Sequence, residues 1–286
     1  MIAGHRVIDI HVHIQPWEMH PPGVQHAMES GRTDLDRIRA FMTSPKAFLA
    51  FLDECGIERV GLINYVAPDV MGFTSEVNAW CARYASAAPD RLIPFGSVNP
   101  RFTKDAAGET ERVLDLGIRG LKVHPPHQVF GVNDYRTGGA GAGIGDVYRI
   151  AEARHVPVMI HTGTSIFPGA RNVYADPMPA DDVGVDFPNL RVILAHAGRP
   201  MYGETALFLL RRHPNFFFDL SSIPPKRLTH YVPKLATVAD RCLWGSDWPS
   251  PGVWDLRKNV EDFLTLDLDD AARRAILFDN AAALFK

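Results

Sequence analysis

Cysteine is scarce in this sequence of 286 residues, which contains only Cys55, Cys81 and Cys242. The three residues are far apart, odd in number and without a Cys-x-x-Cys pair. This usage argues against a secreted disulfide framework and against a thiolate zinc site. A reducing, cytoplasmic location is therefore predicted.

Long apolar runs and a strong excess of charge are also missing. No run approaches the roughly 18 apolar residues that span a bilayer, and polar residues begin within the first predicted strand, so neither a membrane span nor a signal peptide is predicted. The 30 Lys and Arg nearly balance the 33 Asp and Glu, for a formal net charge of -3. This balance gives no broad attraction to nucleic acid or to an anionic membrane surface. The expected partner is a small molecule.

The sequence does contain a regular series of short apolar, β-rich runs. Stretches with helical periodicity separate them, including 45–55, 75–88, 103–116, 145–155, 204–213 and 228–239. A strand and its crossover helix would occupy about 36 residues, the usual size of a βαβ repeat. The runs are 6–14, 59–66, 92–99, 118–125, 156–164, 190–198, 216–222 and 242–249.

We predict an α/β fold, a single (β/α)8 TIM barrel that occupies residues 1–286 as one domain. A doubly wound open sheet is the alternative. The Gly-x-Gly-x-x-Gly turn of a dinucleotide-binding sheet is absent after the first predicted strand. In a barrel, the long connections 15–44 and 165–186 would lie at the carboxyl-terminal mouth, where long loops often become lids.

Imidazole and carboxylate groups are placed at the ends of several predicted strands. In the first strand, alternation sends Asp9, His11 and His13 to one face and the intervening apolar residues to the other. On its own, this pair of histidines is equally consistent with hydrogen-bonded core residues.

Three further strands end in a polar residue, namely His161, His196 and Asp247. Such groups are costly to bury unless they are paired or ligated, and in a barrel these strand ends meet at one mouth. His11, His13, His161 and Asp247 form a ligand set suited to Zn²⁺, with Mn²⁺, iron or cobalt as alternatives.

A divalent ion at this mouth would lower the pKa of a bound water from about 15.7 toward about 7. Asp247 could both contact the ion and accept the proton of that water. His196 would then polarise a substrate carbonyl or donate a proton to the leaving group.

The segments 9–13 (Asp-Ile-His-Val-His) and 245–249 (Gly-Ser-Asp-Trp-Pro), together with His161 and His196, resemble the amidohydrolase superfamily. The similarity is to its amidohydrolase-2 branch, which also contains the aminocarboxymuconate semialdehyde decarboxylase-like enzymes. It covers nearly the whole chain, including the closing segment 275–281. The resemblance implies a metal-centred barrel with His11, His13, His161 and Asp247 as ligands and His196 as a catalytic residue.

The fourth predicted strand leaves the metal count open, because alternation points Lys122 and His124 into the barrel. In binuclear members of the superfamily, a carboxylated lysine on this strand bridges two ions, and His161 and His196 would serve the second. The branch usually resembles the mononuclear pattern, so one ion is favoured, with Lys122 and His124 near the substrate. A structural pairing of Lys122 with an interior carboxylate such as Asp9 is the other interpretation.

Basic residues after the strand ends indicate an anionic, carboxylate-bearing substrate, and Arg171 and Arg199 are the predicted anchors. Trp248 is a candidate for a ring-stacking wall, although it could equally be a structural wedge beside Pro249. Phe167 is a further candidate for the wall, as are Trp17 and Trp254.

The predicted activity is metal-dependent hydrolysis of an ester, lactone or amide bond in a small carboxylate-bearing substrate. The alternative is metal-dependent, non-oxidative decarboxylation of an unsaturated or aromatic acid at the same site. Exposed helices on a barrel commonly pair, so a homodimer is compatible with the prediction.

Overall fold

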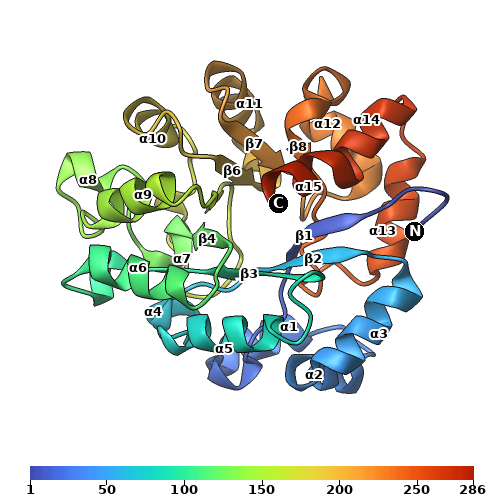
Figure 1. Ribbon diagram of the computed structural model, residues 1–286, viewed down its shortest axis with the longest axis horizontal. Helices are drawn as coiled ribbons and strands as arrows, with labels where there is room; N and C mark the ends of the chain where they lie inside the picture. Colours follow the sequence, from blue (N-terminus) through green and yellow to red (C-terminus); the bar gives the residue numbers. More distant parts are fainter.

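The computed structural model describes residues 1–286, and its eight strands form one parallel sheet in sequence order (Figure 1). This arrangement confirms the predicted (β/α)8 barrel. Every predicted apolar run contains one strand, although each strand is shorter than its run. The strands are β1 (Ile8–Val12), β2 (Arg59–Leu62), β3 (Leu92–Gly96), β4 (Gly120–Val123), β5 (Val158–His161), β6 (Val192–Ala195), β7 (Phe216–Asp219) and β8 (Cys242–Leu243).

The barrel closes between β8 and β1 through contacts that continue beyond the two residues of β8. Ile10 donates its backbone N–H to Trp244 O at 3.0 Å, and His13 donates to Trp248 O at 2.8 Å. Between these bonds, the N–H of Asp247 donates to His11 O at 2.8 Å. This closure brings the first predicted histidines directly beside Asp247.

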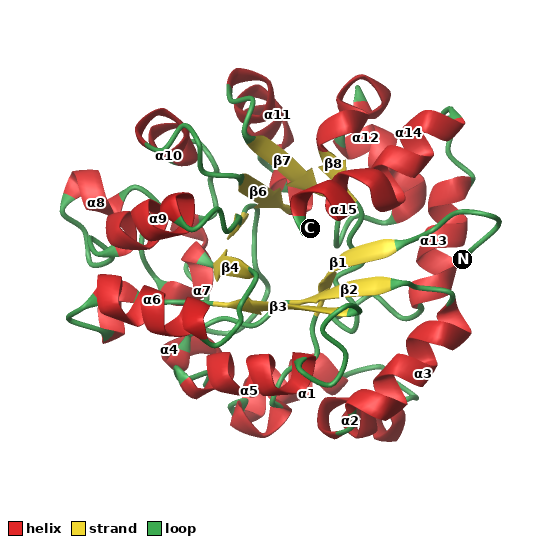
Figure 2. Ribbon diagram, in the orientation of Figure 1, coloured by secondary structure: helices red, strands yellow, loops and turns green.

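Helices form an outer ring around the strands (Figure 2). None of them combines the length and the apolar character required to cross a bilayer. The longer ones are α2 (Leu35–Thr43), α3 (Pro45–Cys55), α5 (Glu76–Ala85), α6 (Ala106–Asp115), α9 (Ile144–Ala153), α11 (Gly203–Arg212) and α13 (Leu256–Leu264). The shorter ones are α1 (Pro22–Glu29), α4 (Pro68–Met71), α7 (Pro125–Gln128), α8 (Asp134–Thr137), α10 (Ala180–Asp186), α12 (Leu228–Tyr231), α14 (Asp270–Arg274) and α15 (Asn280–Leu284).

The helix predicted over 228–239 is interrupted. Helix α12 ends at Tyr231, and a separate 3-10 helix follows over Leu235–Arg241. Pro233 explains the break, because a proline disfavours helical geometry in the residue before it. Val232 accordingly leaves the helix with φ -125° and ψ 78°.

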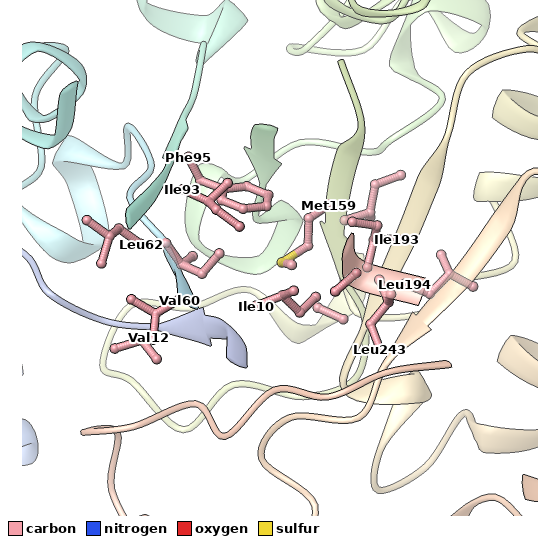
Figure 3. Close-up of a cluster of buried hydrophobic side chains, with 14 of the residues drawn as sticks. Ile10, Val12, Val60, Leu62, Ile93, Phe95, Met159, Ile193, Leu194 and Leu243 are labelled. Carbon is pink, nitrogen blue, oxygen red and sulfur yellow. The ribbon is translucent and has the colours of Figure 1, made fainter. Parts of the chain in front are cut away.

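The apolar residues of the strands and of the inner helix faces form one cluster of 85 buried side chains. Figure 3 shows part of it, with residues of β1, β2 and β3 facing residues of β5, β6 and β8. This packing fixes the backbone of the strands, and therefore the positions of the polar residues at their carboxyl ends.

The opposite end of the barrel is closed by the last residues of the chain, which lie near the centre of the ring in Figure 1. Phe285 is buried and meets the ring of Phe95 edge-on, with 5.6 Å between ring centroids. Arg59 and Arg119 each donate to Phe285 O, at 3.0 and 2.7 Å. Arg191, which precedes β6, donates to Leu284 O at 3.4 Å.

We expect the substitution F285A to lower the free energy of unfolding by about 3–5 kcal/mol, because it leaves a cavity beneath the barrel. Chemical denaturation monitored by circular dichroism would measure the change. The matched variant F102A removes a ring that is 51% exposed, and should change stability by less than about 0.5 kcal/mol. Equal effects of the two variants would contradict this account of the barrel floor.

Candidate active site

A cavity of about 480 Å³ opens at the carboxyl-terminal end of the strands. It brings together most of the residues that the sequence singles out, from strands at all sides of the barrel. Arg171 and Trp248 are predicted site residues that do not line it. The predicted residues in its lining are His11, His13, Lys122, His124, His161, His196, Arg199 and Asp247.

His11, His13 and Asp247 form the most compact group in this cavity. Asp247 Oδ1 lies 2.8 Å from His13 Nε2 and 3.4 Å from His11 Nε2. One ligand atom from each of the three residues lies within 4.8 Å of the others. Asp247 has φ of 72°, in the left-handed region that costs a non-glycine residue about 1–2 kcal/mol. Its backbone bond to His11 O helps to hold this conformation.

Asp219, at the end of β7, orients His11. It accepts a very short hydrogen bond from His11 Nδ1 and another from Ser221 Oγ at 2.7 Å. A proton on Nδ1 leaves the Nε2 lone pair of His11 facing Asp247, as in metal sites where a carboxylate orients a ligating histidine. Gly245 makes room for the pair, because a Cβ there would lie 2.3 Å from Asp219 Oδ1 and 2.9 Å from His11 Cβ. Sequence reasoning assigned Asp219 no definite role, although its place at a strand end was an available signal.

The protonation states of this group suit a cation. Burial holds the pKa of His11 well below its ordinary value, so the ring is neutral. Burial alone would raise the pKa of Asp247, but the hydrogen bond with His13 and the neighbouring positive charges hold it below its usual range. A carboxylate oxygen that faces an imidazole lone pair at 3.4 Å is unfavourable unless a cation lies between them. The donor set therefore fits a divalent ion bound by His11, His13 and Asp247.

His161 and His196 extend the polar end of the cavity. The His196 ring centroid lies 4.9 Å from that of His11 and 4.7 Å from that of His161. His196, His11 and Asp219 form a second group with converging donor atoms. His161 belongs to neither compact group, and its ring stacks on His124 at 3.8 Å while its Nε2 lies 3.2 Å from Gly163 O. Its role as a metal ligand stays a prediction.

A family model for amidohydrolases matches residues 8–286. The chain belongs to the amidohydrolase family. This family is metal-dependent, in agreement with the donor set at the strand ends.

Among curated proteins, a 4-sulfomuconolactone hydrolase from Rhizobium radiobacter is 39% identical over 72 residues. The match covers 23% of this chain and 24% of that hydrolase. Among solved structures, an uncharacterized TIM-barrel protein from Bordetella bronchiseptica aligns with a TM-score of 0.73 and 26% identity over 98% of each chain.

A second solved structure is a 5-carboxyvanillate decarboxylase from Novosphingobium aromaticivorans, complexed with manganese and 4-hydroxy-3-methoxy-5-nitrobenzoic acid. It aligns with a TM-score of 0.71 and 15% identity, over 99% of this chain and 96% of the decarboxylase. At this identity the likeness concerns the fold alone.

In this amidohydrolase, Lys122 lies within the barrel and is 1% exposed. Burial lowers the pKa of its ammonium group, and the charges of Asp219 and Asp247 oppose that shift. Its Nζ lies 3.4 Å from Met159 Sδ, and no ion pair joins it to Asp9. Asp9 instead accepts the backbone N–H groups of His11 and Ser246 at 3.1 and 3.0 Å. Asp9 is therefore not the partner of Lys122, and the interior carboxylates that act on its charge are Asp219 and Asp247.

Arg199 is the predicted substrate anchor that the amidohydrolase brings to its cavity. The guanidinium group donates a short hydrogen bond to Ser222 Oγ, whereas its buried Nε has no partner. Arg171 lies on the exposed surface of the connection after β5, with its backbone N–H bonded to Pro126 O at 2.8 Å. The expectation that Arg171 anchors the substrate therefore needs correction, because its side chain lies outside the cavity lining.

Trp248 also departs from its predicted role as a ring-stacking wall. It is 1% exposed and packs against Phe48, Phe51 and Phe41 at centroid distances of 6.2, 5.3 and 6.1 Å. The left-handed backbone of Asp247 turns the chain beyond β8, so Asp247 lines the cavity and the Trp248 side chain packs toward α2 and α3. Of the other aromatic candidates, Phe167 lines the cavity.

Proposed function

We propose that this amidohydrolase is a hydrolase that uses a metal-activated water on an ester, lactone or amide bond. The observation that carries the proposal is the convergence of His11 Nε2, His13 Nε2 and Asp247 Oδ1 at the base of the cavity. A divalent ion held by these residues, Zn²⁺ with Mn²⁺ as the alternative, would supply Lewis acidity and a water of low pKa. One ion is favoured because the second compact group shares His11 and commits Asp219 to orienting it.

Side chains of the cavity supply the proton transfers and the substrate contacts. Asp247 accepts the proton of the attacking water. His196 donates its Nδ1–H to Ser221 O at 3.2 Å, which leaves Nε2 unprotonated in the neutral ring that burial favours by lowering its pKa. His196 Nε2 must therefore take up a proton before it delivers one to the leaving group. Lys122 and His124, both in the cavity lining, are placed to contact the substrate.

A small substrate with a carboxylate group suits this cavity. Its volume of about 480 Å³ accommodates a small organic molecule. Arg199 lies in the cavity lining, and its guanidinium group is a matching partner for a carboxylate. We also propose a cytoplasmic location, which the three buried, free cysteines support. A homodimer formed through exposed helices is the proposed assembly.

The second candidate is non-oxidative decarboxylation of an unsaturated or aromatic acid. This reaction would use the same metal ligands and Arg199 as the same carboxylate anchor. The proton would be delivered to a carbon atom instead of to a leaving group. The similar fold of the manganese-containing 5-carboxyvanillate decarboxylase favours keeping it as the alternative.

The hydrolase proposal predicts metal-dependent lactone opening. Protein stripped with a chelator should be inactive, and one equivalent of Zn²⁺ or Mn²⁺ should restore activity. The assay panel contains 4-sulfomuconolactone, muconolactone and 5-carboxyvanillate, with acid release followed by titration and carbon dioxide by headspace analysis. Release of carbon dioxide without lactone opening would replace the proposal with its alternative. Absence of bound metal, with no activity gained on adding either ion, would overturn both.

Arg199 predicts a preference for carboxylate-bearing substrates. The variant R199M should lower kcat/KM for muconolactone by about 10- to 100-fold, because a charge-assisted hydrogen bond is lost. For the neutral lactone γ-crotonolactone, R199M should lower kcat/KM by less than about threefold, since this substrate has no carboxylate to bind. R171M is the matched control, because Arg171 lies outside the cavity lining. An equal loss on both lactones in R199M would argue against a carboxylate anchor.

A further inference from the structure

A hydrogen-bonded chain of three side chains runs along the wall of the cavity. Tyr65 follows β2, His127 lies on α7 and Ser165 follows β5. Tyr65 Oη lies 2.9 Å from His127 Nδ1, and His127 Nε2 lies 2.6 Å from Ser165 Oγ. All three residues line the cavity, and the mechanism above uses none of them.

The His127 ring carries a single proton. It is 2% exposed and stacks on His124, with 3.6 Å between centroids and 11° between the ring planes. Burial, with the nearby charge of Lys122, lowers the pKa of His127 to about 3. Burial also raises the pKa of Tyr65, so its hydroxyl keeps its proton. A neutral imidazole donates from one ring nitrogen and accepts at the other, so the chain has one direction.

Burial at the two ends of the chain decides that direction. Tyr65 is 2% exposed, and His127 is the hydrogen-bond partner of its hydroxyl. If His127 donated to Tyr65, the Tyr65 proton would have only water in the cavity as an acceptor, and at a side chain that is 2% exposed this leaves the hydroxyl poorly satisfied. Tyr65 therefore donates to Nδ1, and His127 donates from Nε2 to Ser165 Oγ. Ser165 Oγ also accepts the backbone N–H of Phe167 at 3.3 Å.

Ser165 then has both lone pairs engaged and its own proton free. Its side chain is half-buried at the cavity wall, so the hydroxyl is free to donate its proton to a group in the cavity. We propose that Ser165 is a substrate-binding residue whose hydroxyl donates to an oxygen of the substrate, with Tyr65 and His127 as the positioning residues that fix this donor.

This inference rests on the proposed function and adds a second recognition point to it. None of the three residues belongs to the compact donor group of His11, His13 and Asp247, so Ser165 would meet the substrate at a point apart from that group. Arg199 follows β6 and Ser165 follows β5, and the N–H of Thr164 donates to Arg199 O at 3.3 Å, so the two residues lie on neighbouring loops of the wall. The expected substrate class has a carboxylate and a separate carbonyl, hydroxyl or sulfonate oxygen. An analogue with an alkyl group in place of that oxygen should be rejected, since the donor would stay unpaired.

The first test measures the direction of the chain without any substrate. Proteins labelled with ¹⁵N-histidine report the tautomer of each neutral ring through their nitrogen chemical shifts, and an H127Q spectrum assigns the signal. We expect the Nε2–H tautomer for His127. The Nδ1–H tautomer would overturn the proposal, whether or not the protein opens lactones.

The second test is a double-mutant cycle at Ser165 and His127. It measures KM and kcat on whichever substrate of the assay panel the protein turns over. S165A should raise KM by about 3- to 10-fold with little change in kcat, the effect of losing one neutral hydrogen bond. H127F should raise KM by a similar factor, and the double variant H127F/S165A should have the same KM as S165A alone. H127Q keeps an N–H donor, so its KM should lie between those of H127F and the wild type. S86A, on the exposed end of α5, is the control.

An unchanged KM in S165A, or additive losses in the double variant, would overturn the substrate role of Ser165. If the lactones are inert and 5-carboxyvanillate releases carbon dioxide, the hydrolase proposal fails, and the same cycle tests Ser165 on that substrate. The tautomer measurement keeps the two failures separate.

Discussion

D247N is expected to lose bound metal and to lower kcat/KM by about 10³-fold or more. Asp247 Oδ1 faces the Nε2 atoms of His13 and His11 at 2.8 and 3.4 Å, and it is the only carboxylate of that compact group. Asparagine has nearly the same shape but no charge, so it can neither neutralise the ion nor accept the proton of the attacking water. Metal per chain, measured by mass spectrometry, and kcat/KM on the active panel substrate would be determined on the same preparation.

The matched control is D240N, because Asp240 is an exposed carboxylate on the same stretch of chain before β8. It should retain the metal content and the kinetics of the wild type. Full metal content with unaltered turnover in D247N would contradict both the ligand and the proton-acceptor role. Full metal content with lost turnover would restrict Asp247 to the proton-acceptor role.

D219N is expected to weaken metal binding by about 10- to 100-fold, although Asp219 is assigned no contact with the ion. The amide cannot accept the His11 Nδ1 proton as strongly, so His11 no longer presents a single Nε2 lone pair to the cavity. Burial raises the pKa of Asp219, while the hydrogen bonds from Ser221 oppose that shift and favour the ionised acceptor. Competition with a chelator of known affinity would measure the change in the dissociation constant of Zn²⁺ or Mn²⁺.

The chain offers a close control in the pair formed by Asp181 and His213. Asp181 Oδ1 lies 2.7 Å from His213 Nε2, and His213 is likewise buried, but neither residue lines the cavity. D181N should therefore lower stability without changing metal affinity. Equal metal affinity in D219N and D181N would mean that the orientation of His11 does not depend on Asp219.

The parts of the site that could be predicted from the sequence are those that depend on local periodicity. Alternation along β1 places His11 and His13 on one face, and His161 follows a buried run at the end of β5. In a parallel barrel such strand ends meet at one mouth, so their convergence required no knowledge of individual contacts. The helix predicted over 228–239 is interrupted at Pro233, because a proline disfavours helical geometry in the residue before it.

Other features depend on contacts between segments that are far apart in the chain. Asp219 bonds to His11 across 208 positions, and His127 bonds to Tyr65 and Ser165 across 62 and 38 positions. Nothing in the local pattern of β7 or α7 reveals these partners. Trp248 is buried outside the barrel, whereas Arg199 lies at the cavity. These positions likewise depend on packing against other elements.

Side-chain period and strand order are properties of the chain, and they were sufficient to predict the eight-strand barrel and the gathering of imidazoles and a carboxylate at its mouth. Three further outcomes required the folded molecule: which nitrogen of His11 faces Asp247, which strand-end residues form the compact donor group, and which hydroxyl at the cavity wall has a free proton. Those outcomes are decided by hydrogen-bond partners and burial, and both exist only once distant strands and loops are packed together.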